Sequence, residues 1–163
     1  MQSTLRPEAI NDETARVGAA LSGVLADTFV LYVRTHGFHW NVTGRKFRTL
    51  HLMFEEQYNE LWSALDPIAE RIRALGQPAP GSVQGLMALA ELPEAEALLD
   101  SRGMIKAALD GHLAVVRRAK AVLATAETAQ DPATVDLLTQ RIASHEKTAW
   151  MLRALLSEDE PVR

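Results

Sequence analysis

Two histidines separated by twelve residues, His39 and His51, are the first candidates for metal ligands in this sequence. The second of them begins a row of mostly polar side chains spaced three or four residues apart. The row consists of His51, Glu55, Asn59, Trp62, Asp66 and Glu70. In a helix, this spacing places all six side chains on one face. Imidazole and carboxylate groups without a thiolate suit iron, manganese or zinc, so the row predicts a metal-binding face.

The helix that must position this row is itself marked by a second, apolar row. Between Phe47 and Leu75, apolar residues recur every three or four positions, which predicts a long amphipathic helix. The metal-binding row lies one residue further on and is rotated by about 100° from the apolar row. Residues 13–39 predict a preceding helix, and the short NVTGR segment between the two predicts an antiparallel hairpin. That hairpin brings His39 and His51 to similar heights on neighbouring helices.

The second half of the chain predicts another helical hairpin. After the break at QPAPGS, the segment SVQGLMALA predicts a short helix, and ELPEAEALLD predicts a loop. Long helices follow over residues 101–127 and from Pro132 to about Leu156, with Asp131 as the N-cap of the last. We therefore expect an all-α fold, a four-helix bundle with one long crossover carrying a short helix. Residues 1–163 form one domain, with a non-basic extension over 1–12 and an acidic tail over 158–163.

Composition excludes several classes of function. The chain has 163 residues and no cysteine, which rules out disulfides, thiolate zinc sites and a cysteine nucleophile and fits a reducing compartment. The net charge of −4 argues against the phosphate backbone of nucleic acid as a default partner. We find neither a signal peptide nor an apolar stretch long enough to span a bilayer. The expected location is the cytoplasm, without a membrane partner.

The two ends of the metal-binding row are too far apart to share one metal ion. His51 and Asp66 are separated by 15 residues, which is about 22 Å along a helix. Two copies of the helix crossing antiparallel about a two-fold axis near residues 60–61 solve this problem. One such axis places His51 opposite Glu70 and Glu55 opposite Asp66 of the partner subunit. The sequence thus predicts two half-sites per chain, completed in a two-fold dimer.

Less specific interpretations of the row are also open. A solvated helix face can carry acids in register by chance, although Trp62 at its centre indicates contact with another surface. Iron is favoured over zinc because the predicted site is rich in carboxylates and spread over two chains. The chain contains no Glu-x-x-His arrangement, which argues against a ferritin centre inside a single bundle.

Two long motifs resemble the Dps mini-ferritins. HWNVTGRKFRTLHLMFEE is similar to their first signature, with His-Trp, a glycine five residues after the first histidine and a second histidine twelve residues after it. LDPIAERIRALGQPA resembles their second signature, and HEKTAWMLR resembles their last helix. The similarity extends over about residues 13–157, which is nearly the whole chain.

This resemblance implies a ferritin-like bundle assembled from two-fold dimers into a hollow homo-dodecamer. It also implies a ferroxidase centre at the dimer interface, where Fe(II) is oxidised to Fe(III), preferably with hydrogen peroxide rather than oxygen, and is stored as mineral. The implied ligands are His39 and His51 from one subunit, with Asp66 and Glu70 from its two-fold partner. Glu55 joins the first pair, at a position where the family most often has aspartate. Trp40 matches a tryptophan commonly found beside the first ligand.

The family is also named for DNA binding, usually through a lysine-rich tail. Here the first 20 residues contain Arg6 and Arg16 but no lysine, and the chain ends in the acidic segment SEDEPVR. We therefore expect protection of DNA to be indirect, through removal of iron and peroxide in the bacterial cytoplasm or nucleoid. A nucleoid-associated DNA-binding structural protein is the alternative. A metal-free helical scaffold is a third, which leaves the metal-binding row unexplained.

Some residues with suitable chemistry receive a structural interpretation. His36 faces away from His39 and is expected to have a structural or surface role. His112 and His145 are expected to serve packing or an interface. Trp40 and Trp62 are expected to pack near the site, and absorption of stray oxidising equivalents by them is a further hypothesis. Asp131 and Asp136 are candidates for lining an iron-entry pore, although capping already accounts for Asp131.

Overall fold

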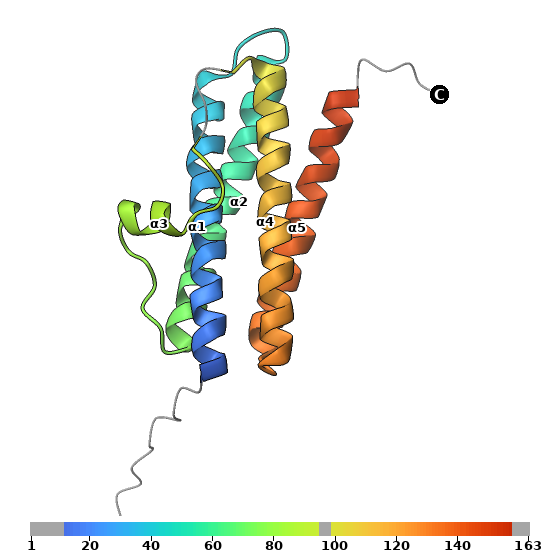
Figure 1. Ribbon diagram of the computed structural model, residues 1–163. Coiled ribbons are helices and arrows are strands. Elements are labelled where there is room, and N and C mark those ends of the chain that lie inside the picture. The colour runs from blue at the N-terminus through green and yellow to red at the C-terminus, as the bar shows by residue number, and fades with distance from the viewer. Residues whose placement is uncertain (1–11, 95–98, 158–163) are drawn as a thin grey trace, which may run out of the picture.

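Four long antiparallel helices form the body of the protein, which confirms the predicted all-α bundle. The computed structural model describes residues 12–94 and 99–157. The helices are α1 (Asp12–Asn41), α2 (Phe47–Ala74), α3 (Val83–Leu89), α4 (Ser101–Thr128) and α5 (Pro132–Leu156). As Figure 1 shows, α1 pairs with α2 and α4 pairs with α5, while the short α3 lies beside α1 on the crossover between the two hairpins.

Local sequence signals account for most of the helix ends. Asp131 accepts a hydrogen bond from the backbone N–H of Thr134 at 3.1 Å, which confirms its predicted role as the N-cap of α5. Asp100 caps α4 in the same way, and Ser82 caps α3. The turn between α1 and α2 contains Gly44 with φ of +100°, a backbone conformation that favours glycine.

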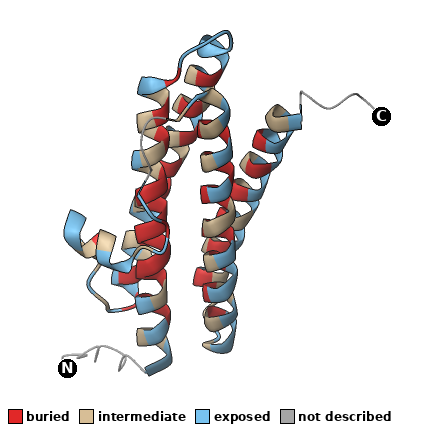
Figure 2. Cartoon of the chain, turned by 45° about the horizontal axis from the view of Figure 1, so that its top comes forward, coloured by how far each residue is buried: buried red, intermediate tan, exposed pale blue. Residues whose placement is uncertain are grey.

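The core runs through the middle of the bundle, and the outer faces of the helices are exposed (Figure 2). Its central cluster joins three long helices through Leu31 of α1, Leu61 of α2 and Val115 of α4. Gly111 of α4 permits close packing here, because a Cβ atom at this position would lie 2.6 Å from Leu31. The apolar row predicted for α2 is therefore its core face, and the metal-binding row lies to one side of it.

Helix α2 continues through Pro67 without interruption. Two expectations change in the structure. Asp12, which we placed in the N-terminal extension 1–12, is the first residue of α1, and residues 1–11, 95–98 and 158–163 lie outside the described part. Helix α1 is long and apolar enough to span a membrane by length and composition, contrary to our expectation. However, 67% of its most apolar stretch is buried inside the bundle, as in the core helix of a soluble protein.

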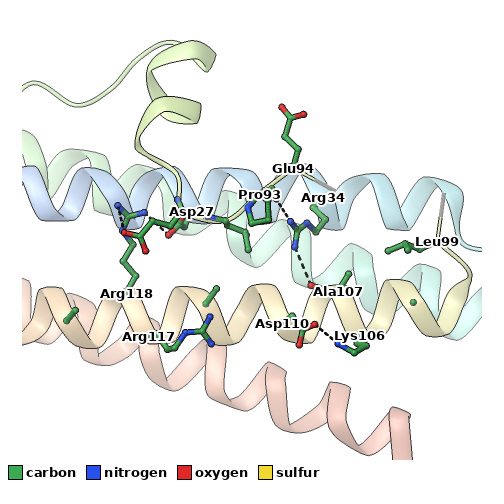
Figure 3. Close-up of a pocket in the computed structure, with 15 residues that line it drawn as sticks. Asp27, Arg34, Pro93, Glu94, Leu99, Lys106, Ala107, Asp110, Arg117 and Arg118 are labelled. Atoms are coloured by element: carbon green, nitrogen blue, oxygen red, sulfur yellow. Dashed lines mark hydrogen bonds and ion pairs between the residues drawn. The ribbon is translucent and has the colours of Figure 1, made fainter. Parts of the chain in front are cut away.

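A buried carboxylate fastens the crossover to the bundle. Asp27 of α1 is 1% exposed and accepts hydrogen bonds from the backbone N–H groups of Glu91 and Leu92 at 2.7 and 2.9 Å. Its other oxygen accepts a hydrogen bond from Arg118 of α4 at 2.8 Å (Figure 3). Because this one side chain of α1 satisfies donors from both the crossover and α4, it determines where the crossover passes over α1 and α4.

Asp27→Ala should lower the free energy of unfolding by about 3 kcal/mol, because it leaves Arg118 and two backbone N–H groups without their buried acceptor. Urea unfolding followed by circular dichroism measures this loss. The matched control is Lys106→Ala, which removes the exposed Lys106–Asp110 pair of α4 and should change stability by less than about 0.5 kcal/mol. Equal effects of the two substitutions would contradict the role assigned to Asp27.

Candidate metal centre

His39 and His51 lie together at one end of the α1–α2 hairpin, as predicted. Their rings are stacked, with centroids 3.8 Å apart and planes 20° apart. The Nδ1 atom of His39 lies 2.9 Å from the backbone carbonyl oxygen of His51, and the Nδ1 atom of His51 lies 2.8 Å from the carbonyl oxygen of His39. Because a carbonyl can only accept, each ring carries its proton on Nδ1 and keeps the lone pair of Nε2 for a ligand.

The local fold explains this reciprocal arrangement. The carbonyl group of His39 lies in the last turn of α1, where backbone carbonyls lack partners within the helix. The turn around Gly44 reverses the chain, so that the first turns of α2 pass beside this end of α1. Phe47 stacks on the outer side of His51 with centroids 5.1 Å apart. Two imidazole nitrogens are therefore oriented before any metal binds.

The carboxylates of the metal-binding row lie at different distances from the histidines along α2. Glu55 is half-buried and one helical turn from His51, whereas Asp66 and Glu70 are exposed on a distant part of the helix. At about 1.5 Å per residue, Asp66 lies about 22 Å from His51. Within residues 12–94 and 99–157, no group of three or more potential ligands converges in one chain. The structure thus brings together His39 and His51 but leaves Asp66 and Glu70 separate.

The surface around the row has the character of a contact face. Trp62, in the middle of the row, is 59% exposed and touches Tyr32 of α1 with ring centroids 5.3 Å apart. A surface cavity of about 590 Å³ beside it is lined partly by Phe29, Leu86 and Asp66. Large apolar side chains left in solvent beside unpaired carboxylates are typical of a surface that another protein covers. Trp40, beside the histidines, is 67% exposed.

His36 does not join the His39–His51 pair, in agreement with its predicted structural role. Its ring stacks on Tyr58 at 3.9 Å, and its Nδ1 atom lies 3.2 Å from the hydroxyl group of Tyr32. Both interactions hold it among the aromatic rings between α1 and α2. It also lies near Trp40 and the ring of His39, with centroids 4.3 and 6.0 Å away, but it makes no hydrogen bond to either histidine of the pair.

The two candidate pore residues have different environments. Asp131 pairs with Arg71 at 2.7 Å in addition to capping α5. Burial opposes its negative charge, but hydrogen bonds from Arg71 and Thr134 outweigh burial and lower the pKa of Asp131. Asp136 is exposed and accepts a hydrogen bond from Gln140 at 2.7 Å. The structure thus engages Asp131 in holding α2 to α5, and a pore role remains a proposal for both residues.

A large surface cavity lies away from His39 and His51. It has a volume of about 770 Å³ and is bounded by α1, α4 and the crossover (Figure 3). Most of its charges are paired, since Arg118 contacts Asp27 and Glu91, and Lys106 contacts Asp110. Size alone therefore does not identify a metal site in this protein.

One buried pair of polar side chains could not be recognised from the sequence. His112 and His145, expected to have packing roles, are almost completely buried and contact each other through their Nδ1 atoms at 2.8 Å. They are 33 residues apart on different helices. No spacing pattern within one helix can indicate such a pair.

His39→Leu should weaken binding of a divalent probe such as Co²⁺ by at least about 10-fold, because it removes one of two pre-oriented imidazole nitrogens. Visible absorbance during an anaerobic Co²⁺ titration of the assembled protein measures the change. His36→Leu serves as the control, since its ring contacts aromatic side chains instead. Equal weakening in both variants would show that the His39–His51 pair is not the binding element.

Comparison with known proteins agrees with the helical-bundle fold. The ferritin-like domain family matches residues 18–161. A DNA protection during starvation protein 2 from Bacillus anthracis is 36% identical over 138 residues, covering 85% of this chain and 94% of its own. A DNA protection during starvation protein from Brevibacillus brevis is 35% identical over 140 residues, covering 86% and 94%.

Solved structures of similar fold are also Dps proteins. A Dps protein from Vibrio cholerae, described as a member of a superfamily of ferritin-like diiron-carboxylate proteins, superposes with a TM-score of 0.85 at 33% identity and covers 88% of this chain and 91% of its own. A Dps protein from Bacillus brevis superposes with a TM-score of 0.87 at 34% identity and covers 90% and 98%. Together with the bundle and its paired histidines, these similarities show that the chain belongs to the Dps proteins of the ferritin-like family.

Proposed function

We propose that this protein oxidises Fe(II), preferably with hydrogen peroxide, at a centre shared by two subunits and stores the ferric product in a hollow twelve-subunit shell. The observation that carries the proposal is the pair of imidazole rings whose Nε2 atoms are free while both Nδ1 atoms are hydrogen-bonded. In this proposal, iron is the substrate that is oxidised and also the material that is stored. The expected location is the bacterial cytoplasm.

Sharing between subunits follows from the geometry of α2. A second copy crossing antiparallel about a two-fold axis near residues 60–61 brings Glu70 of the partner subunit towards His51 and Asp66 of the partner subunit towards Glu55. Trp62 then lies close to the axis, where its exposed ring is covered. Each dimer contains two equivalent sites, and each site combines histidines from one chain with carboxylates from the other.

The chemistry of the donor set fits iron. Imidazole nitrogen and carboxylate oxygen bind ferrous ion, and hard carboxylate oxygens favour the ferric product. Two Fe(II) ions supply the two electrons that reduce one hydrogen peroxide molecule to water, with two protons from solution. The role of this chain is to hold the ions next to one another and to the oxidant. Glu55 is one methylene longer than aspartate, so it reaches further from α2 than the residue common in the family.

The test of the shared site uses two complementary variants. His39→Ala with His51→Ala removes one half-site, and Asp66→Ala with Glu70→Ala removes the other; each variant alone should lose peroxide-dependent Fe(II) oxidation. Random reassembly of equal amounts should restore about one quarter of wild-type activity, because half of the dimers are mixed and each mixed dimer has one intact site of two. Ferric absorbance measures the rate, and native mass spectrometry verifies subunit number and mixing.

Unmixed samples of each variant, carried through the same dissociation and reassembly, are the controls for this experiment. Assemblies that contain both variants but remain inactive would refute a centre shared between chains. Inactive wild-type protein would refute the ferroxidase proposal itself.

A nucleoid-associated DNA-binding protein is the second candidate, because relatives carry the name DNA protection during starvation protein. The net charge of −4 and the absence of lysine from the first 20 residues oppose direct binding. We expect no gel shift of linear duplex DNA at about 150 mM salt, with a lysine-tailed variant of this chain as the positive control. A shift by the unmodified protein under these conditions would favour the second candidate.

A further inference from the structure

A chain of polar side chains, buried at His112, His145 and Arg141 and half-buried at Glu60 and Ser144, links α4, α5 and α2 apart from the proposed metal centre. His112 of α4 and His145 of α5 are 2% and 1% exposed. The Nε2 atom of His145 lies 3.2 Å from Nη2 of Arg141, one turn away on α5. Arg141 donates two hydrogen bonds to Glu60 of α2, which also accepts one from Ser144 at 2.8 Å. We call these five residues the histidine latch.

The positions of the protons in the histidine latch follow from its donors. A guanidinium group only donates, so the Nε2 atom of His145 accepts from Arg141. A neutral His145 ring then carries its proton on Nδ1 and donates it to Nδ1 of His112, 2.8 Å away. His112 must accept at Nδ1 and carries its own proton on Nε2. Both rings are thus neutral, and each has one nitrogen used as an acceptor.

An additional proton has no suitable position in this chain. On Nε2 of His145, it would point at the N–H group of Arg141; on Nδ1 of His112, it would point at the N–H group of His145. Either position replaces a hydrogen bond by two donors facing each other in a buried environment, which is strongly unfavourable. The added positive charge would also lie close to the Arg141 guanidinium.

We propose that the histidine latch is an acid-sensitive device that holds α2 against α4 and α5 at neutral pH and releases them when either histidine is protonated. Apolar side chains of α2 and α5 share two core clusters, but polar connections between these helices are few in the part of the chain that the structure describes. The second polar connection between α2 and α5 is the Arg71–Asp131–Thr134 group, which lies near the beginning of α5. Figure 1 shows the other end of α5 leaning away from the remaining helices. Protonation of either histidine breaks the hydrogen bonds that link His112 of α4 to His145 and His145 to Arg141. It also places a positive charge beside Arg141, the residue that connects α5 to Glu60 in the middle of α2.

The charges around the two rings favour their neutral forms. Burial is the largest cause and lowers the pKa of His112 to about 4; Glu60 opposes this shift, while Arg141 adds to it. Burial, followed by the proximity of His112 and Arg141, holds the pKa of His145 well below its usual value. From α1, Leu31 and the guanidinium group of Arg34 approach Gly111, the residue before His112, and Arg34 donates a hydrogen bond to the backbone carbonyl of Ala107. Glu60 from α2 and Arg141 from α5 are the charged groups that act on the pair.

The direction of the pH effect follows from these shifts. Both histidines bind protons more weakly in the folded protein than in the unfolded chain, where the pKa is 6.5. Their contribution to stability is complete above about pH 6.5 and is lost as the pH falls towards about 4. Within this range, each histidine raises the unfolding equilibrium constant by up to about 10-fold per pH unit, so the pair raises it by up to about 100-fold.

One consequence rests on the proposed function. Helix α2 carries Glu60 on the side that faces α5 and the metal-binding row on another side. Movement of α2 in acid would therefore disturb both half-sites, so that mild acidity would weaken iron binding. The histidine latch itself can be tested without iron, so its failure and the failure of the ferroxidase proposal are distinguishable.

The test compares the pH dependence of urea unfolding in the full-length assembled protein, at about pH 7, 5.5 and 4.5. The variant carries His112→Leu with His145→Leu, which keeps the interior filled and removes both titrating groups. As the pH falls from 6.5 to 4.5, the unfolding equilibrium constant of this variant should rise less steeply than that of the wild type. The difference should reach up to about 100-fold per pH unit, the contribution of the two missing histidines. The control carries Lys120→Met with Glu146→Gln, which removes an exposed ion pair between α4 and α5. It should behave as the wild type.

A second measurement needs no substitution. Hydrogen–deuterium exchange of the wild-type assembly, corrected for the intrinsic effect of pH, should show amides near Glu60 and Arg141 losing protection before those in the middle of α1. A double-histidine variant with unchanged pH dependence would overturn the proposal. Uniform loss of protection along the four long helices would do so as well.

Discussion

The geometry of one continuous helix determines how this protein can bind metal. Helix α2 runs for 28 residues without interruption, even through Pro67. Its rise of about 1.5 Å per residue keeps His51 and Asp66 far apart, and no bend brings them together. A site that needs both imidazole and several carboxylates must therefore recruit a second copy of the helix. The exposed Trp62 at the centre of the row is consistent with this requirement, since a large aromatic side chain is costly to leave in water.

The interior of the bundle offers a physical reason why metal chemistry belongs at the surface. Ferritin-like bundles can hold metal ions between facing helices through carboxylate and histidine ligands. In this chain, the guanidinium group of Arg141 occupies the interior and already engages both oxygens of Glu60. His112 and His145 bind each other. A cation placed among these groups would meet a fixed positive charge and no free carboxylate.

Two histidine pairs in the same fold thus have opposite hydrogen-bonding patterns. In the pair at the hairpin, backbone carbonyls accept from Nδ1 and leave both Nε2 atoms available. In the buried pair, acceptor nitrogens are used by side-chain donors, and no acceptor is free. Burial alone does not decide between these patterns. The difference lies in the partner of each ring. A carbonyl accepts the proton of one ring nitrogen, so the lone pair of the other nitrogen stays available, whereas a donor N–H group forms a hydrogen bond with that lone pair.

The parts of this protein that depend on short-range periodicity could be predicted from the amino-acid sequence. The extents of the four long helices, the cap at Asp131 and the row from His51 to Glu70 are all repeated or adjacent features, and the structure reproduces them. The separation of the half-sites also followed, because helical rise is independent of context. The relative positions of two residues in one helix follow from the number of residues between them.

Contacts between side chains of different helices could not be predicted, because they depend on how the helices pack. The reciprocal hydrogen bonds of His39 and His51 depend on how closely the hairpin packs, and the contact of His112 with His145 depends on the axial offset of α4 against α5. Likewise, α1 resembles a membrane span in composition, and only its packing against the other helices shows that it is a core helix. Such relations depend on packing between distant segments, which periodicity within one segment does not specify.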